Sequence, residues 1–327
     1  MTLIENDVNE IAKLLIMHYN HSSRNDLSAM PEYSSVHATS RGISRATRCN
    51  IVVQAGEFTR SVLDAVHGLT NKGVGGISIV GVASQSDEET LELIGTLGQQ
   101  SDAFALLAKN TERVGAALLK LRRSDIPVIA LVSDLDANVR STYIGGDNRA
   151  AGELAGFILG RCLERESGAQ VAIIACNLAY RCWEDREIGF RSLLRRRFPQ
   201  IDIVELVTED DSPQSTCEAA LRALSNGRAV GGIYNVTGEN QRLAQAIGEM
   251  RLPRRPLYIT HELHEATEPF LRSGVIDFLI TENLESIVNV VKRFLIGLRT
   301  GAARCGEINL VPTELISKFN LQSRTIL

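Results

Sequence analysis

Short apolar segments alternate with segments of helical periodicity over most of the chain. Residues 51–54 are followed by 58–69, in which Val62, Val66 and Leu69 share one helical face. Strands that are apolar on both faces and alternate with helices are typical of a parallel sheet covered on both sides. The same pattern predicts further strands at 76–80, 103–107, 128–132, 143–144, 171–175, 203–206, 232–234, 257–260 and 276–280, with an edge strand at 307–310.

The helices expected between these strands carry recognisable ends. Asp147 or Asn148 can act as an N-cap, because a short side-chain oxygen accepts from the free amides of the first turn. A second helix is expected to begin at Pro213, with Ser212 as its N-cap, and to end before Gly227. Other helices are predicted at 88–97, 111–122, 184–197, 239–247, 265–272 and 284–298.

The segment 143–161 lies between two similar series of strand–helix units. Right-handed crossovers make each series a Rossmann-like half. Two such halves imply a ligand cleft at the carboxyl ends of both sets of strands. The alternative interpretation is that 143–161 is an ordinary strand-to-helix turn like the others in the chain.

Residues 1–48 differ from the rest. An amphipathic helix is expected at 6–19, and 21–48 are polar with little periodicity. Acidic and basic residues balance there, although Arg41, Arg45 and Arg48 cluster at the end. A balanced segment favours a solvated tether over an arm that grips DNA.

Composition narrows the class of protein. The 327 residues are 44% hydrophobic and carry a net charge of −4, which gives no overall attraction to nucleic acid. No export signal or membrane-spanning apolar run is evident. The six cysteines are scattered without a C-x-x-C pair, so we expect reduced thiols in a cytoplasmic protein.

Few motifs indicate chemistry. The run 261–265, His-Glu-Leu-His-Glu, lacks the H-E-x-x-H spacing, so a loop entering a helix is favoured over a metal site. The glycines of 73–76 precede a strand and fit no phosphate-binding loop, and no G-x-S-x-G elbow occurs. No activated nucleophile or acid–base pair stands out, so we expect neither an enzyme nor a cofactor, and an enzyme on this α/β scaffold is the minor alternative that turnover of a bound ligand would support.

The order of several motifs identifies a family resemblance. Ile126-Pro127-Val128 precedes YIGGDNRAAGELAGFILGR, and YRCWEDREIGFRSLL follows the next strand. GGIYNVTGENQRLAQAI and PLYITHELHEATEPFLRSGVIDFLITENLES come later. From about Asn50 onward the chain resembles the effector-binding core of lactose-repressor (LacI) type regulators, which periplasmic sugar-binding proteins of the ribose type share.

The resemblance implies two Rossmann-like subdomains joined by a three-strand hinge, the periplasmic binding protein type I fold. The N-terminal region would be 1–48 and the core 49–327. Subdomain 1 would comprise about 49–146 plus 283–311, and subdomain 2 about 147–282 plus 312–327. The resemblance also implies a homodimer.

The same resemblance suggests which residues contact the ligand. Arg186 matches an arginine that binds sugar hydroxyls, Glu262 a strand-end aspartate, and Glu282 a polar hinge residue. Phe58 lies where aromatics stack on a sugar, and Asn235 and Thr237 occupy the equivalent turn of the second half. His261 is a candidate to face the cleft beside Glu262, and Trp183 either stacks on a ligand or packs its loop.

Two departures from the family pattern modify these expectations. The ribose-type proteins carry an Asp-Arg pair where this chain has Val132-Ser133 and then Asp134, so Asp134 is the ninth candidate ligand contact, as a replacement for that aspartate, and ribose itself is disfavoured. The effector is expected to be a sugar or related small polar ligand, and acids at Asp134, Glu262 and Glu282 would suit a polyol, an aminosugar or another cationic ligand. The residues after 12 supply no recognisable helix-turn-helix. Operator DNA is therefore a partner implied by the family only, and the alternative is a cytoplasmic sugar-binding sensor without direct DNA binding.

Overall fold

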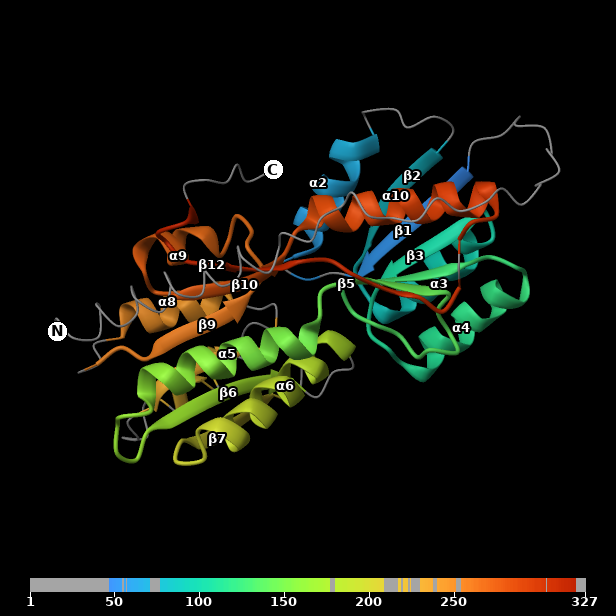
Figure 1. Ribbon diagram of the computed structural model, residues 1–327. Coiled ribbons are helices and arrows are strands. Elements are labelled where there is room, and N and C mark those ends of the chain that lie inside the picture. Colours follow the sequence, from blue (N-terminus) through green and yellow to red (C-terminus); the bar gives the residue numbers. More distant parts are fainter. Residues whose placement is uncertain are drawn as a thin grey trace, which may run out of the picture.

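The computed structural model contains two sheets, each of six strands (Figure 1). The structure describes residues 47–54, 56, 58–70, 77–176, 180–208, 217–218, 220–222, 224, 230–237, 240–250, 254–303 and 305–321. The helix predicted at 6–19 and the cap predicted at Ser212 lie outside these residues, as does Gly227. Within the described residues, no helix combines the length and the apolar composition needed to cross a membrane.

The first sheet has the strand order β11-β5-β4-β3-β1-β2, and all of its pairings are parallel. Helices α2 and α10 share one hydrophobic cluster with this sheet, and α3 and α4 share another. The sheet is thus covered on both faces, which is why its central strands are apolar throughout. Its elements are β1 (Thr47–Gln54), α2 (Thr59–Thr70), β2 (Ile77–Ser84), α3 (Asp87–Gly98), β3 (Ala103–Leu107), α4 (Glu112–Arg123), β4 (Val128–Leu131), β5 (Thr142–Gly145), α10 (Leu284–Thr300) and β11 (Ile308–Leu310).

The second sheet has the order β12-β10-β9-β8-β6-β7, in which only β12 is antiparallel. Helices α5 and α6 cover one face, and α8 and α9 pack on the other. Its elements are α5 (Asn148–Leu163), β6 (Gln170–Cys176), α6 (Arg181–Arg197), β7 (Asp202–Thr208), β8 (Val230–Asn235), α8 (Gln241–Glu249), β9 (Leu257–His261), α9 (Glu268–Ser273), β10 (Phe278–Glu282) and β12 (Thr313–Ile316).

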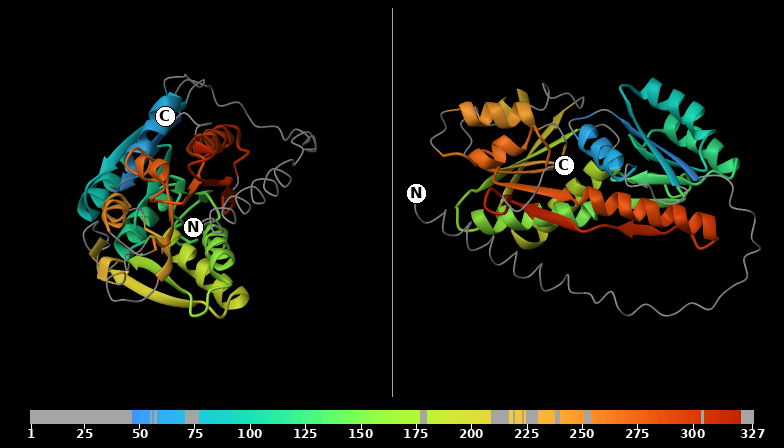
Figure 2. Two further views of the ribbon diagram at one scale, coloured as in Figure 1. Left: turned by 90° about the vertical axis from the view of Figure 1, so that its left-hand side faces the viewer. Right: turned by 90° about the horizontal axis from the view of Figure 1, so that it is seen from above.

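The chain passes between the sheets three times, from β5 to α5, from β10 to α10 and from β11 to β12. Figure 2 shows these connections running side by side between the two lobes. Two of the crossings end in capped helices, because Asp147 accepts from the Ala150 amide and Asn283 from the Ser286 amide. The Asp147 cap confirms the prediction made for this position.

The α/β class with two mostly parallel sheets confirms the predicted fold. Some boundaries differ. Helix α9 begins at Glu268 rather than at 265, because Pro269 occupies the first turn and the residues before it form a turn closed by Thr267. Strand β10 begins and ends two residues later than the predicted strand at 276–280 and runs to Glu282. The short antiparallel strand β12 was not predicted.

Candidate functional site

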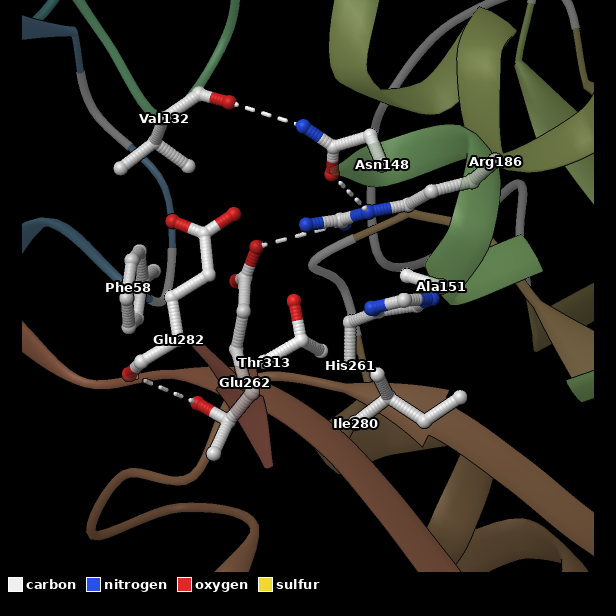
Figure 3. Close-up of a pocket in the computed structure, with 11 residues that line it drawn as sticks. Phe58, Val132, Asn148, Ala151, Arg186, His261, Glu262, Ile280, Glu282 and Thr313 are labelled. Carbon is white, nitrogen blue, oxygen red and sulfur yellow. Dashed lines mark hydrogen bonds and ion pairs between the residues drawn. The ribbon is translucent and has the colours of Figure 1, made fainter. Parts of the chain in front are cut away.

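A small cavity lies between the two sheets, where several strands end (Figure 3). Val132 follows β4, Glu262 follows β9, and Glu282 is the last residue of β10. The carboxyl ends of parallel strands are the usual place for a ligand in α/β proteins. The cavity has a volume of about 10 Å³ and is lined by Phe58, Val132, Asn148, Ala151, Arg186, His261, Glu262, Ile280, Thr281, Glu282 and Thr313.

Arg186 is the cation of this cavity. It projects from α6 and is only 3% exposed. Its Nε donates to Asn148 Oδ1 at 2.8 Å, and its Nη1 donates to the Val236 carbonyl at 3.3 Å. Nη1 also lies 3.6 Å from Glu262 Oε1, an ion pair drawn in Figure 3. The guanidinium is therefore held in one orientation by groups of the second sheet and its helices.

Asn148, the first residue of α5, connects Arg186 to the first sheet. Its Nδ2 donates to the Val132 carbonyl at 3.0 Å and lies 3.2 Å from the Tyr143 hydroxyl. Val132 has a φ of 60°, a left-handed conformation that is costly for a β-branched residue. The strained residue is thus the one whose carbonyl accepts the hydrogen bond from Asn148. Asn148 in turn accepts from Arg186 and fixes its orientation.

Close packing of α5 against α6 brings Arg186 to the cavity. A Cβ at Gly152 would overlap the backbone carbonyl of Arg186 itself. A Cβ at Gly189 would likewise overlap the backbone carbonyl of Arg149. These two glycines therefore allow the helices to approach at backbone contact distance.

Glu282 ends β10 at the point where the chain crosses to the first sheet. Burial raises the pKa of its carboxyl to about 7, against the lowering effects of Arg186 and of a hydrogen bond from the Gly146 amide. A Cβ at Gly146 would lie only 2.8 Å from Glu282 Oε1. Within the described part of the chain, Oε2 of Glu282 is buried without a hydrogen-bond partner.

His261 and Glu262 form the end of β9. His261 Nε2 lies 2.7 Å from the Tyr234 hydroxyl, and burial together with nearby Arg186 keeps the pKa of the imidazole well below its ordinary value. His261 is therefore neutral at physiological pH. Glu262 has a φ of 72°, a conformation uncommon for a residue other than glycine. This turn directs the Glu262 carboxylate toward Arg186.

Five of the nine residues expected to contact a ligand line the cavity, and four do not. Asp134 instead pairs with Arg140, whose Nη2 donates to its Oδ2 at 3.0 Å. Trp183 is buried against Tyr180, with ring centroids 4.6 Å apart. Both side chains have found partners within their own part of the fold.

Asn235 and Thr237 are also satisfied away from the cavity. Asn235 Oδ1 accepts from the Thr237 amide at 3.1 Å, and Asn235 Nδ2 donates to Asn240 Oδ1 at 2.9 Å. Both residues are fully buried. Their hydrogen bonds stabilise the turn after β8 instead of lining the cavity.

The cavity also contains residues that the sequence reasoning missed. Asn148 was considered only as a helix cap, and Thr313 lies on the strand that was not predicted. The sequence did contain a feature that could have indicated Asn148. Of the two adjacent polar residues at this strand-to-helix turn, only Asp147 is needed to cap the helix, so the side chain of Asn148 can face the cavity.

The cavity offers hydrogen bonding and charge rather than an evident reaction centre. Among the described residues, no group of three or more His, Cys, Asp or Glu side chains is arranged to hold a metal ion. The volume of about 10 Å³ has room for roughly one water molecule. A larger ligand therefore requires the two sheets to separate.

Comparisons with known proteins define the class. A family model described as "Periplasmic binding protein domain" matches residues 67–301, most of the chain. The protein belongs to this family of two-subdomain binding proteins. No curated protein sequence matches the chain significantly.

Three solved structures illustrate the likeness of fold. GanP, a glucose-galactose binding protein from Geobacillus stearothermophilus, is 17% identical with a TM-score of 0.74, covering 85% of this chain and 99% of that chain. A solute-binding protein from Burkholderia graminis in complex with D-arabinose is 20% identical, with a TM-score of 0.76 and coverage of 86% and 98%. A candidate LacI transcriptional regulator from Bacteroides fragilis is 16% identical, with a TM-score of 0.73 and coverage of 86% and 100%.

Proposed function

We propose that this chain binds a sugar or a related small polar ligand in the cavity between its subdomains. The observation that carries the proposal is the buried guanidinium of Arg186, positioned by Asn148 and flanked by Glu262 and Glu282. A fixed fork of donors beside carboxylates suits adjacent hydroxyl groups, which both donate and accept. The proposed contacts are Phe58, Arg186, His261, Glu262 and Glu282. Similar structures that bind D-arabinose or glucose and galactose support the same ligand class.

Ligand binding would be coupled to movement of the subdomains. Both sheets contribute to the cavity, and three connections cross between them. The hinge would lie near Gly146, Glu282 and Val311, between subdomain 1 (49–146 and 283–311) and subdomain 2 (147–282 and 312–327). A ligand that contacts both sides has unequal affinity for the open and closed states and shifts their equilibrium.

We further propose that the binding event serves a LacI-like transcriptional regulator, acting as a cytoplasmic homodimer on operator DNA. One observation supports this finer role, the similarity to the Bacteroides fragilis protein. The matched structures are covered almost completely by 83–86% of this chain, so the chain is longer than its neighbours. The alternative is a sensor that binds the same ligand without touching DNA.

A thermal-shift screen tests the ligand-binding step. The panel contains neutral sugars, polyols, aminosugars and sugar phosphates. A ligand at ~100 times its dissociation constant should add roughly 2.7 kcal/mol to the free energy of unfolding, a readily measured rise in melting temperature. The absence of any shift across the panel would refute the proposal.

A gel-shift assay separates the regulator from the sensor. The full-length chain is mixed with the DNA upstream of its own gene, with and without the ligand found in the screen. A shifted band that responds to the ligand supports the regulator. Equal mobility with the upstream DNA and with unrelated DNA of the same length favours the sensor.

A further inference from the structure

The charges of the cavity are unbalanced. Arg186 and Glu262 form an ion pair, with 3.6 Å between Nη1 and Oε1. Glu282 is a second carboxylate, 9% exposed, and its Oε2 has no partner among the described residues. Among the residues that the structure describes, no lysine and no second arginine lines the cavity. When Glu282 is ionised, these three side chains carry a net negative charge.

The hydrogen-bonding groups around Arg186 do not compensate for this charge. The Asn148 amide is occupied on both sides, by Arg186 at its oxygen and by the Val132 carbonyl at its nitrogen. The neutral imidazole of His261 is bonded to the Tyr234 hydroxyl. The buried Glu282 Oε2 is therefore a strong acceptor that faces the cavity without a donor of the protein, and a buried charge is stable only when it is paired.

Phe58 lines the same cavity as Glu282 (Figure 3). The face of an aromatic ring attracts a cation within about 6 Å, and a carboxylate supplies the opposite charge. An aromatic ring and an unpaired buried carboxylate bordering so small a cavity are the complement of an organic ammonium group. A neutral hydroxyl would pair with Oε2 but would leave the charge uncompensated.

We propose that the ligand is a protonated aminosugar or amino-polyol, whose ammonium group binds between Glu282 and Phe58 while its hydroxyls meet Arg186. This rests on the proposed binding function and specifies its ligand class. The cation supplies the charge that Glu282 lacks, so binding favours the ionised carboxylate.

Binding then depends on pH in a defined direction. The groups that act on Glu282 are Arg186 from α6, Glu262 after β9, the Gly146 amide before α5 and the Tyr143 hydroxyl of β5, and none of them is an unpaired cation. With its pKa near 7, Glu282 is largely protonated at lower pH and must release its proton to the solvent before it can pair with a cationic ligand. The affinity for an amine that stays protonated over the whole range, such as an amino-polyol, should fall roughly 30-fold from about pH 8 to about pH 5.5, whereas that for a neutral sugar should not.

Matched ligands test the proposal by isothermal titration calorimetry on the full chain. Glucamine is compared with sorbitol, and glucosamine with glucose and with N-acetylglucosamine, in which acylation removes the charge. We expect the best amine to bind at least about tenfold more tightly than its neutral parent near pH 8. Titrations in two buffers of different ionisation enthalpy should show proton release near pH 7 with the amine only.

Two variants locate the effect. Glu282→Gln keeps the shape of the side chain and should reduce the preference for the amine to no more than about twofold. Glu285→Gln removes an equal charge from an exposed position three residues away and should keep the full preference. If Glu282→Gln does not fold, the proton release of the unchanged protein still decides.

The outcomes separate this proposal from the function on which it rests. Neutral sugars that bind as tightly as their amines, without proton release, overturn the ligand class and leave sugar binding intact. A panel in which nothing binds overturns the binding function itself. A preference for the amine that survives Glu282→Gln contradicts the assigned position of the ammonium group.

Discussion

The two halves of the molecule are alike in architecture and unlike at the cavity. The first sheet contributes the side chains of Phe58 and Val132, both apolar, whereas the charged side chains come from the second sheet and its helices. A carboxylate lies at or just beyond the end of a strand in each half. Asp134 of the first half pairs with Arg140, but Glu282 of the second has one buried oxygen without a partner among the described residues.

This contrast separates two uses of an acidic residue at a strand end. Asp134 has its own arginine six residues further along the chain, so the pair is complete without a ligand. Glu282 shares its surroundings with Arg186, which Glu262 already contacts. A buried carboxylate whose charge the protein leaves unbalanced marks a place for a ligand more clearly than its position in the fold does.

The largest effect is expected for Arg186→Met, which fills a similar volume without charge. Glu282 would then lack its nearby cation and Glu262 the guanidinium that it contacts, which should cost about 3–5 kcal/mol of unfolding free energy near pH 8. The loss should shrink near pH 5, where the Glu282 carboxyl is protonated. Urea denaturation at both pH values measures it.

Arg140→Met is the matched control in the first half. The Asp134 side chain is 27% exposed and can be solvated when its partner is removed, so the loss should stay below about 2 kcal/mol. Equal losses in the two variants would contradict the distinction between the two halves.

A smaller effect is expected from the titration of Glu282. Its pKa of about 7 in the folded state exceeds the ordinary value of 4.5, so the folded protein binds more protons than the unfolded chain between these values. The contribution of Glu282 to stability is therefore present below about pH 4.5 and is lost as the pH rises through 7, by about 3 kcal/mol in total.

Glu282→Gln removes this titration. Relative to the unchanged protein, the variant should gain stability steadily from about pH 5 to about pH 8. Parallel urea denaturation series of the two proteins give the difference. A constant difference across that range would show that the Glu282 carboxyl titrates normally.

The smallest effect is expected for Asp134→Asn. Arg140 is buried, but the Asp134 end of the pair is 27% exposed, and the Asn oxygen can still accept a hydrogen bond from the guanidinium, so the change in the free energy of unfolding should be no more than about 1 kcal/mol. Thermal unfolding is a sufficient measurement. A loss as large as that of Arg186→Met would place Asp134 among the essential charges.

Most of the fold could be predicted because buried parallel strands are apolar on both faces. Strands β3 and β9 are fully buried, and their sequences show it. Strand β12 was missed because it is short, mixed in polarity and antiparallel, and it lies at the edge of its sheet, where β10 is its one neighbour among the described strands. The start of α9 was misplaced because the acidic residue at 265 resembles a first turn, although Pro269 sets the true one.

The site was harder to predict, for a different reason. Sequence order places polar residues at strand ends, and by that logic Asp134, Asn235 and Glu282 look equivalent. Which of them faces the cavity depends on partners such as Arg140 and Asn240, which only the folded chain brings into contact. Arg186 was found through the family resemblance, but the role of Asn148 in orienting it is visible only in the structure.

Calorimetric titration of the best ligand into three proteins tests the central claim directly: the unchanged chain, Arg186→Met and Asp134→Asn. Binding to Arg186→Met should be at least about 100-fold weaker, because two hydrogen bonds to a charged group, worth about 1.5–3 kcal/mol each, are lost. Binding to Asp134→Asn should match the unchanged chain. Equal affinity in Arg186→Met and the unchanged chain would show that the ligand binds elsewhere.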